Sequence, residues 1–223
     1  MFGAFDIDNA VNPSFKKNYT YIPQVSNNVE GALAEEVKYF AADFLNFRSI
    51  APNLHEVMLN KNGSVGDIKL SWSSSDNMMK KIMNYSSKNQ SKIHYRIGRS
   101  LNGGPIKPER IDLYIYVVKQ IVDRYTNRWK EIGLPRPVEE YAIWNEPDLP
   151  FFFTGQNPRD PRTEYFNMYL LLAKAVKEMA PSALVGGPGV ATYSSEMFLE
   201  RFLRYCSETN APLDFFHDSK LFN

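Results

Sequence analysis

The spacing of hydrophobic residues along the chain predicts five helices. In the clearest one, at residues 108–132, hydrophobic side chains recur every three or four positions, as on the buried face of a helix. These side chains are Ile111, Ile115, Val118, Val122, Tyr125 and Trp129. Pro108 suits a first helical turn, and Gly133 suits the position just past the end. We expect the other helices at residues 29–44 and 76–87, between Pro161 and Pro181, and at residues 195–207.

Six short runs of strand-forming residues lie around these helices, at residues 19–25, 45–50, 93–97, 140–144, 183–187 and 213–216. Several of them are apolar at nearly every position, which is typical of strands that are covered on both faces. Strands that alternate with single helices form right-handed crossovers and a parallel sheet. The pattern therefore predicts an α/β fold, either a doubly wound open sheet or a (β/α)8 barrel.

Two observations favour the barrel. The chain contains neither the G-x-G-x-x-G turn nor the P-loop of nucleotide-binding open sheets. Its polar and glycine residues gather directly after the predicted strands, at Arg48 and at residues 98–100, 145–146 and 187–188. Barrel enzymes place their chemistry at that end of the strands. We therefore expect a single domain over residues 1–223, an incomplete (β/α)8 TIM barrel with about six of the eight strand–helix units.

Composition excludes several classes of protein. Lys and Arg number 26 against 25 Asp and Glu, a formal charge of +1, whereas nucleic-acid binding needs an excess or a stripe of basic residues. The single cysteine and three scattered histidines form no disulfide or metal motif. No apolar run approaches the about 20 residues of a membrane span, and the N-terminus has no export-signal pattern. We expect a cytoplasmic protein without a metal, cofactor or membrane contact; its oligomeric state stays open.

The strongest chemical signal is the segment at residues 141–148, Tyr-Ala-Ile-Trp-Asn-Glu-Pro-Asp. An apolar strand delivers Glu146 to its C-terminal end, and the following proline keeps this residue out of a helix. Cleavage of a glycosidic bond needs a protonated carboxyl group, which apolar walls favour. Trp144 and residues 151–153 are candidates for such walls and for stacking on a sugar, and Asn145 is a candidate partner for a sugar hydroxyl. A solvated glutamate in a proline turn explains the segment equally well.

Trp-Asn-Glu-Pro at the end of a fourth barrel strand resembles clan A glycoside hydrolases, and the longer pattern resembles glycoside hydrolase family 39, the β-xylosidase and α-L-iduronidase relatives. The segments that carry this resemblance are residues 46–48, 95–100, 141–149, 154–155, 165–177 and 185–188. The resemblance implies retaining hydrolysis of a carbohydrate substrate, a β-xyloside-like or related glycoside, without a cofactor. It implies Glu146 as general acid/base, Asn145 as a contact to the 2-hydroxyl, and Arg48 as a group that supports the nucleophile or a sugar hydroxyl.

The chain departs from this family pattern towards its end. The family's nucleophile is a glutamate at the end of the seventh strand, and no position here matches it. The glutamates after the fifth strand, Glu196, Glu200 and Glu208, are expected to be solvated charges of one helix. Where the family has Phe-Phe-Ser-Trp-His, this chain has Phe-Phe-His-Asp-Ser from residue 215. We interpret the barrel as truncated after strand six and His217 as an accident of that end.

Other hypotheses stay open. The chain is alternatively a non-catalytic remnant or a pseudoenzyme that binds sugar, or it has another clan A specificity, such as that of a cellulase or an arabinofuranosidase. His94 is interpreted as an interior histidine rather than a ligand. Trp72 either packs its loop or lines a sugar subsite, and Arg96 is among the third-strand residues that can face the barrel axis.

Overall fold

The structure, a computed structural model, describes residues 26–29, 44–47, 70, 72–89, 92–98, 111–149, 153, 161–191 and 196–218. Its elements in chain order are β1 (Ser26–Val29), β2 (Phe44–Phe47), α3 (Ser73–Asn89), β3 (Lys92–Ile97), α4 (Ile111–Val122), the π-helical turn η4 (Asp123–Asn127), β4 (Glu140–Ile143), α5 (Pro161–Met179), β5 (Leu184–Val190), α6 (Glu196–Thr209) and β6 (Phe215–Asp218). Strands and helices alternate from β2 onward, as the hydrophobic pattern predicts.

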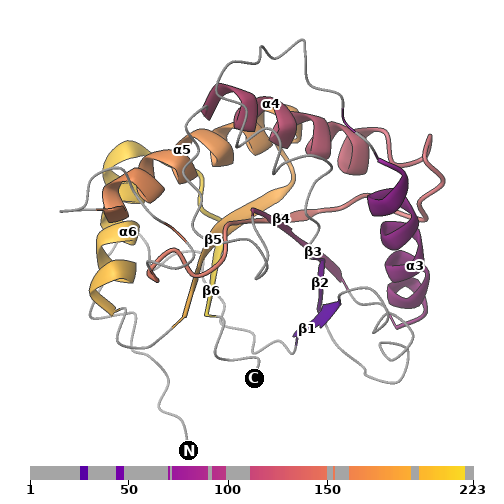
Figure 1. The fold of residues 1–223 in the computed structure, drawn as a ribbon, viewed down its shortest axis with the longest axis horizontal. Coiled ribbons are helices and arrows are strands. Elements are labelled where there is room, and N and C mark those ends of the chain that lie inside the picture. Colours follow the sequence, from indigo (N-terminus) through magenta and orange to yellow (C-terminus); the bar gives the residue numbers. More distant parts are fainter. Residues whose placement is uncertain are drawn as a thin grey trace, which may run out of the picture.

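The six strands that the structure describes form one sheet whose spatial order follows the sequence, β1-β2-β3-β4-β5-β6. Each strand pairs in parallel with the next. Figure 1 shows α3, α4, α5 and α6 in an arc around these strands. Consecutive parallel strands inside a ring of helices are the arrangement of a (β/α)8 barrel, whereas a doubly wound sheet reverses its strand order. The fold is therefore α/β, a partial TIM barrel, as predicted.

The N-terminal part differs most from the prediction. We expected a strand at residues 19–25 and a helix from residue 29, whereas β1 occupies Ser26–Val29. Two asparagines, Asn27 and Asn28, sit in this strand, and asparagine is depleted in strands, so the local pattern gives no strand signal there. The rest of those two predicted elements lies outside the described residues. The other strands and α3, α5 and α6 confirm the predictions with shifted ends.

Helix α4 is shorter than predicted and buries a wider face. The α-helix ends at Val122 and continues as η4, after which residues 128–133 form turns. Of the six residues predicted to face the core, Ile111, Ile115 and Trp129 are only partly buried. Leu113, Tyr114, Val117 and Ile121 are fully buried instead. Because α4 packs against α5 as well as the sheet, its covered face is wider than one stripe.

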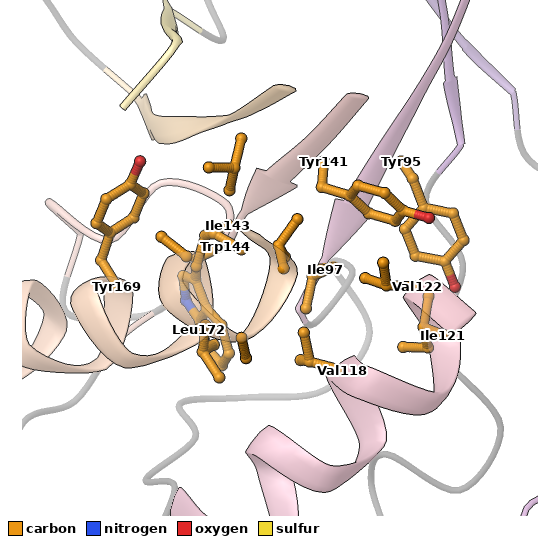
Figure 2. Close-up of a cluster of buried hydrophobic side chains, with 14 of the residues drawn as sticks. Tyr95, Ile97, Val118, Ile121, Val122, Tyr141, Ile143, Trp144, Tyr169 and Leu172 are labelled. Atoms are coloured by element: carbon orange, nitrogen blue, oxygen red, sulfur yellow. The ribbon is translucent and has the colours of Figure 1, made fainter. Parts of the chain in front are cut away.

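The hydrophobic core lies between the sheet and the helices. Figure 2 shows tyrosines and isoleucines of β3 and β4 pointing towards Val118, Ile121 and Val122 of α4. A second aromatic layer joins α5 to α6, where the ring of Phe202 lies 4.7 Å from that of Tyr169 and 5.5 Å from that of Phe166, centroid to centroid. Burial of these large side chains is the main stabilising contribution to such a fold.

Trp72 packs the segment before α3 against η4. Its ring meets Tyr125 edge to face at 5.9 Å, and the Arg124 guanidinium lies over the ring at 4.9 Å. Arg124 also donates hydrogen bonds to both carboxylate oxygens of Asp76 at the start of α3. These contacts support the packing interpretation of Trp72 rather than the sugar-subsite interpretation.

Candidate active site

The strand register divides the residues of β3 and β4 between two faces of the sheet. Tyr95 pairs with Tyr141 and Ile97 with Ile143, and all four are buried on the helix side. Because side chains alternate along a strand, Arg96 lies on the opposite face, towards the barrel axis. This inner face contains the polar residues of both strands and leads to the segment that follows β4.

That segment makes a sharp turn at the carboxyl end of β4. Trp144 and Glu146 both have positive φ angles, 74° and 46°, which are uncommon for residues with a side chain. Such conformations persist only where the surrounding structure holds them. Here the amide of Trp144 donates to the Ile97 carbonyl of β3 at 2.7 Å, and the amide of Glu146 donates to the Gly189 carbonyl of β5 at 2.6 Å. The neighbouring strands thus fix the backbone of Glu146, whose side chain is half-buried.

A third hydrogen bond that holds this turn involves Asp148, two residues after Glu146. Its carboxylate oxygens accept a hydrogen bond from the amide of Ala191, at 3.0 and 3.1 Å. Ala191 directly follows β5, so the turn is bound to this strand on both sides of Pro147. The carboxylate of Asp148 is therefore engaged in shaping the turn that presents Glu146.

Arg96 and Asn145 form a buried pair on the inner face. The Nη1 of Arg96 donates to the Oδ1 of Asn145 at 2.5 Å, and the two residues are 4% and 3% exposed. Hydrogen bonds from a charged donor are shorter and stronger than neutral ones. Asn145 directly precedes Glu146 at the end of β4, and the structure shows Arg96 as the partner of its amide. The role of Asn145 as a substrate contact stays a prediction.

The structure corrects the prediction for Trp144. Its side chain is 1% exposed and belongs to the hydrophobic core, with ring contacts to Tyr114 of α4 at 6.2 Å and Phe153 at 5.7 Å. Figure 2 shows it beside Leu172 of α5. A Cβ added at Gly98, the residue after β3, would lie 2.8 Å from the Trp144 ring, so the two strand ends approach closely. Trp144 therefore packs the end of β4 on the helix side of the sheet, away from the inner face on which Asn145 meets Arg96.

A hydrogen bond from α5 also fixes the end of β4. The hydroxyl of Tyr165 donates to the carbonyl of Ile143 at 3.0 Å. Burial raises the pKa of Tyr165 well above its ordinary value, so the hydroxyl stays protonated and remains a donor. The last residue of β4 is thus held from the helix side, directly before the turn that carries Glu146.

A second polar pair, His94 and Glu140, lies deeper on the inner face. The Nδ1 of His94 is 3.7 Å from a carboxylate oxygen of Glu140, and the ring of Phe215 from β6 lies 5.1 Å from the imidazole. Burial lowers the pKa of His94, an effect that the hydrogen bond to Glu140 opposes and the charge of Arg96 reinforces. This placement agrees with the interpretation of His94 as an interior histidine.

Several predicted residues lie outside the part of the chain whose side chains the structure describes. They are Arg48, Arg99, Ser100, Phe151, Phe152, Glu196 and His217. Glu200 and Glu208 are exposed on α6, and Glu200 pairs with Arg204, as expected of solvated charges. The roles of Arg48 and His217 stay predictions.

The described ranges contain no group of three His, Cys, Asp or Glu side chains that could hold a metal ion. Cys206 is buried on α6, and burial raises the pKa of its thiol to about 12. Among the helices described, none is long and apolar enough to cross a membrane. The candidate site thus consists of Glu146, Asn145 and the residues that hold them.

Sequence reasoning missed two features of this site, the Arg96–Asn145 bond and the tie from Asp148 to Ala191. The sequence carries only part of the signal for the first: strands three and four are adjacent in a barrel and Arg96 is among the residues that can face its axis, but the register that brings it to Asn145 is a tertiary property. The second depends on where the chain leaves β5, for which the sequence carries no signal.

Comparisons with known proteins identify the family of this chain. The family model "Glycosyl hydrolases family 39" matches residues 101–220, more than half of the chain, and the chain belongs to this family. A β-xylosidase of Geobacillus stearothermophilus is 35% identical over 104 residues, which is 47% of this chain and 18% of that protein. The chain thus aligns with about a fifth of the length of this curated relative.

Two solved structures share the fold. A glucosidase from Croceicoccus marinus superimposes with a TM-score of 0.66 at 19% identity, over 87% of this chain and 43% of that one. A monomeric β-xylosidase from Caulobacter crescentus CB15 gives a TM-score of 0.60 at 17% identity, over 87% and 40%. At these identities the likeness shows the fold alone, a TIM barrel.

Proposed function

We propose that this chain supplies the general acid/base of a retaining glycoside hydrolase that acts on a β-xyloside-like glycoside. The observation that carries the proposal is the position of Glu146. It stands at the carboxyl end of a buried parallel strand, in a backbone conformation that bonds from β3 and β5 impose. Membership of family 39 and similarity to a β-xylosidase support the reaction and the substrate class.

In this proposal Glu146 acts twice. Its protonated carboxyl group first gives a proton to the leaving oxygen while the bond to the anomeric carbon breaks and a second carboxylate attacks that carbon. Its carboxylate then accepts a proton from the water whose oxygen displaces the second carboxylate. We assign the second carboxylate to none of the described residues. Glu200 and Glu208 lie exposed on α6, and the carboxylates of Glu140 and Asp148 are engaged with His94 and with the Ala191 amide.

Asn145 is the proposed contact to the hydroxyl next to the anomeric carbon. It is adjacent to Glu146, buried, and fixed by Arg96. Hydrogen bonds to this hydroxyl strengthen as the transition state forms, so an amide held in place contributes to the rate as well as to binding. Arg48 stays a proposed support for this part of the site.

The test compares leaving groups in the Glu146→Gln variant of the native protein. An alkyl β-xyloside needs a proton on its leaving oxygen, so we expect kcat/KM to fall by about 10²–10⁴-fold. A dinitrophenyl β-xyloside leaves without a proton, so its glycosylation step is expected to change by less than about tenfold. Glu139→Gln, an exposed glutamate directly before β4, is the matched control and is expected to leave both rates unchanged.

Equal rates for Glu146→Gln and the wild type on the alkyl substrate would remove Glu146 from the mechanism. The alternative of a sugar-binding protein without catalysis has its own signature in the same samples. Titration with xylose would then show saturable binding, while neither substrate would be hydrolysed by the wild type.

A further inference from the structure

The bond between Arg96 and Asn145 has a direction that the chemistry of the two side chains dictates. A guanidinium group has five N–H donors and no acceptor, whereas an amide has an oxygen that accepts and an NH2 group that donates. Contact between the two is favourable only when the oxygen of Asn145 faces Arg96. The observed bond, from Nη1 of Arg96 to Oδ1 of Asn145 at 2.5 Å, has this orientation.

Burial disfavours any other orientation of the Asn145 amide. Arg96 and Asn145 are 4% and 3% exposed, so water has little access to either group. If the amide flipped, its NH2 group would face the cation and the buried charge would lose this acceptor and gain a repulsive contact, an unfavourable arrangement at low dielectric. The backbone on both sides of Asn145 is also held, since the amide of Trp144 is bonded to β3 and the amide of Glu146 to β5. The amide therefore has one stable orientation.

We propose that Arg96 is a positioning residue that fixes the Asn145 amide with its NH2 group as the donor available to a substrate, so that Asn145 selects for an acceptor oxygen on the sugar. This rests on the proposed function, which makes Asn145 a substrate contact. The consequence is specific: Asn145 gives a hydrogen bond to the 2-hydroxyl oxygen and does not accept one from it. A sugar without that oxygen gains nothing from either Asn145 or Arg96.

The test measures kcat and KM for a dinitrophenyl β-xyloside and its 2-deoxy analogue in the native protein. Asn145→Asp keeps the acceptor for Arg96 but removes the NH2 donor. Arg96→Met removes the bond that orients the amide, and Arg96→Lys restores one donor. On the 2-hydroxy substrate we expect Asn145→Asp and Arg96→Met to lower kcat/KM by about 10–100-fold, the range of a hydrogen bond to a charged or developing-charge group. Arg96→Lys is expected to recover part of this loss.

On the 2-deoxy substrate the same variants are expected to differ from the wild type by less than about threefold in kcat/KM, well below the value of a hydrogen bond to a charged group. If Arg96 had a merely structural role, its substitution would lower kcat/KM equally for both substrates, and that result would overturn the proposal. Full activity of Asn145→Asp on the 2-hydroxy substrate would overturn it as well, because an aspartate carboxylate offers no donor. Arg204→Met, which removes an exposed arginine paired with Glu200 on α6, is the matched control.

A second measurement separates this proposal from the proposed function. If the wild type hydrolyses neither substrate, the hydrolase assignment fails. The unfolding equilibria of Arg96→Met, Asn145→Leu and the double variant then still test whether Arg96 holds the Asn145 amide. Coupling of about tenfold or more in the unfolding equilibrium constant shows that Arg96 holds the amide. Additive effects of the two substitutions would contradict the fixed orientation.

Discussion

Strands β3 and β4 have one face towards the helices and one towards the barrel axis, and the two faces bury different kinds of side chain. On the helix side the strands contribute tyrosines and isoleucines to an apolar core, and on the barrel side they bury a histidine, an arginine and a glutamate. On the apolar face, every side chain that leaves water stabilises the folded state. The polar face stays stable only where each buried group is paired, as Arg96 is with Asn145.

The difference between the two faces indicates where a substitution affects stability and where it affects activity. Residues that face the helices have large apolar contacts and no route to a substrate. Those on the barrel side lead directly to the turn that presents Glu146, so we expect their substitution to change activity more than stability. The predictions below test this division, from the largest expected effect to the smallest.

The largest effect on stability is expected on the helix side, at Phe202. Its side chain is fully buried, and its ring contacts those of Tyr169 and Phe166. Phe202→Ala should lower the free energy of unfolding by about 3–5 kcal/mol, through lost burial and the cavity left behind. Urea unfolding followed by circular dichroism measures the change. A loss below about 1 kcal/mol would show that α6 does not complete the core.

A smaller effect on stability, with a clear effect on activity, is expected at Asp148. Asp148→Ala removes the acceptor for the Ala191 amide and should lower stability by about 1–3 kcal/mol. Because the turn carrying Glu146 then loses one of its two bonded contacts to the β5 end and keeps only the bond from the Glu146 amide to Gly189, kcat should fall while KM changes less. Asp148→Asn keeps an acceptor oxygen and is expected to recover most of both losses. Full activity of Asp148→Ala would show that the tie does not position Glu146.

The smallest effect concerns pH and the buried His94. Burial lowers its pKa in the folded protein below the ordinary 6.5, so the folded state binds this proton less readily than the unfolded state. Its contribution to stability is therefore complete above pH 6.5 and is lost as the pH falls from 6.5 towards the folded-state pKa. Comparing urea unfolding of the wild type and His94→Gln from pH 7.5 to 5 measures this contribution. The variant should lose less stability over this range, and parallel curves would contradict the shift.

The sequence predicts those features of the fold that depend on local pattern. Helix α5 begins at Pro161 and ends before Pro181, the two prolines from which the sequence predicts its bounds. The strand that delivers Glu146 is recognisable because an apolar run ends at Asn-Glu-Pro. By contrast, β1 carries two asparagines, so the sequence pattern does not reveal this strand; in the structure it pairs in parallel with β2.

For the candidate site, the sequence identifies the residues that lie together but not their orientation. Strict alternation places Trp144 opposite Ile143, on the barrel side. The positive φ of Trp144 interrupts the alternation and returns its ring to the core beside Tyr114. The partner of Asn145 depends on the register of β3 against β4, which is a tertiary property. Side-chain direction after a strand therefore requires the structure.

The most direct test of the central claim, that Glu146 is the acid/base at the end of β4, is rescue of the Glu146→Ala variant by sodium azide. With a dinitrophenyl β-xyloside, the glycosyl-enzyme forms without acid assistance but waits for a base to activate water. Azide needs no base, so we predict that it restores turnover and gives a β-xylosyl azide that retains the anomeric configuration. An azide-independent rate with xylose as the only product would contradict the claim.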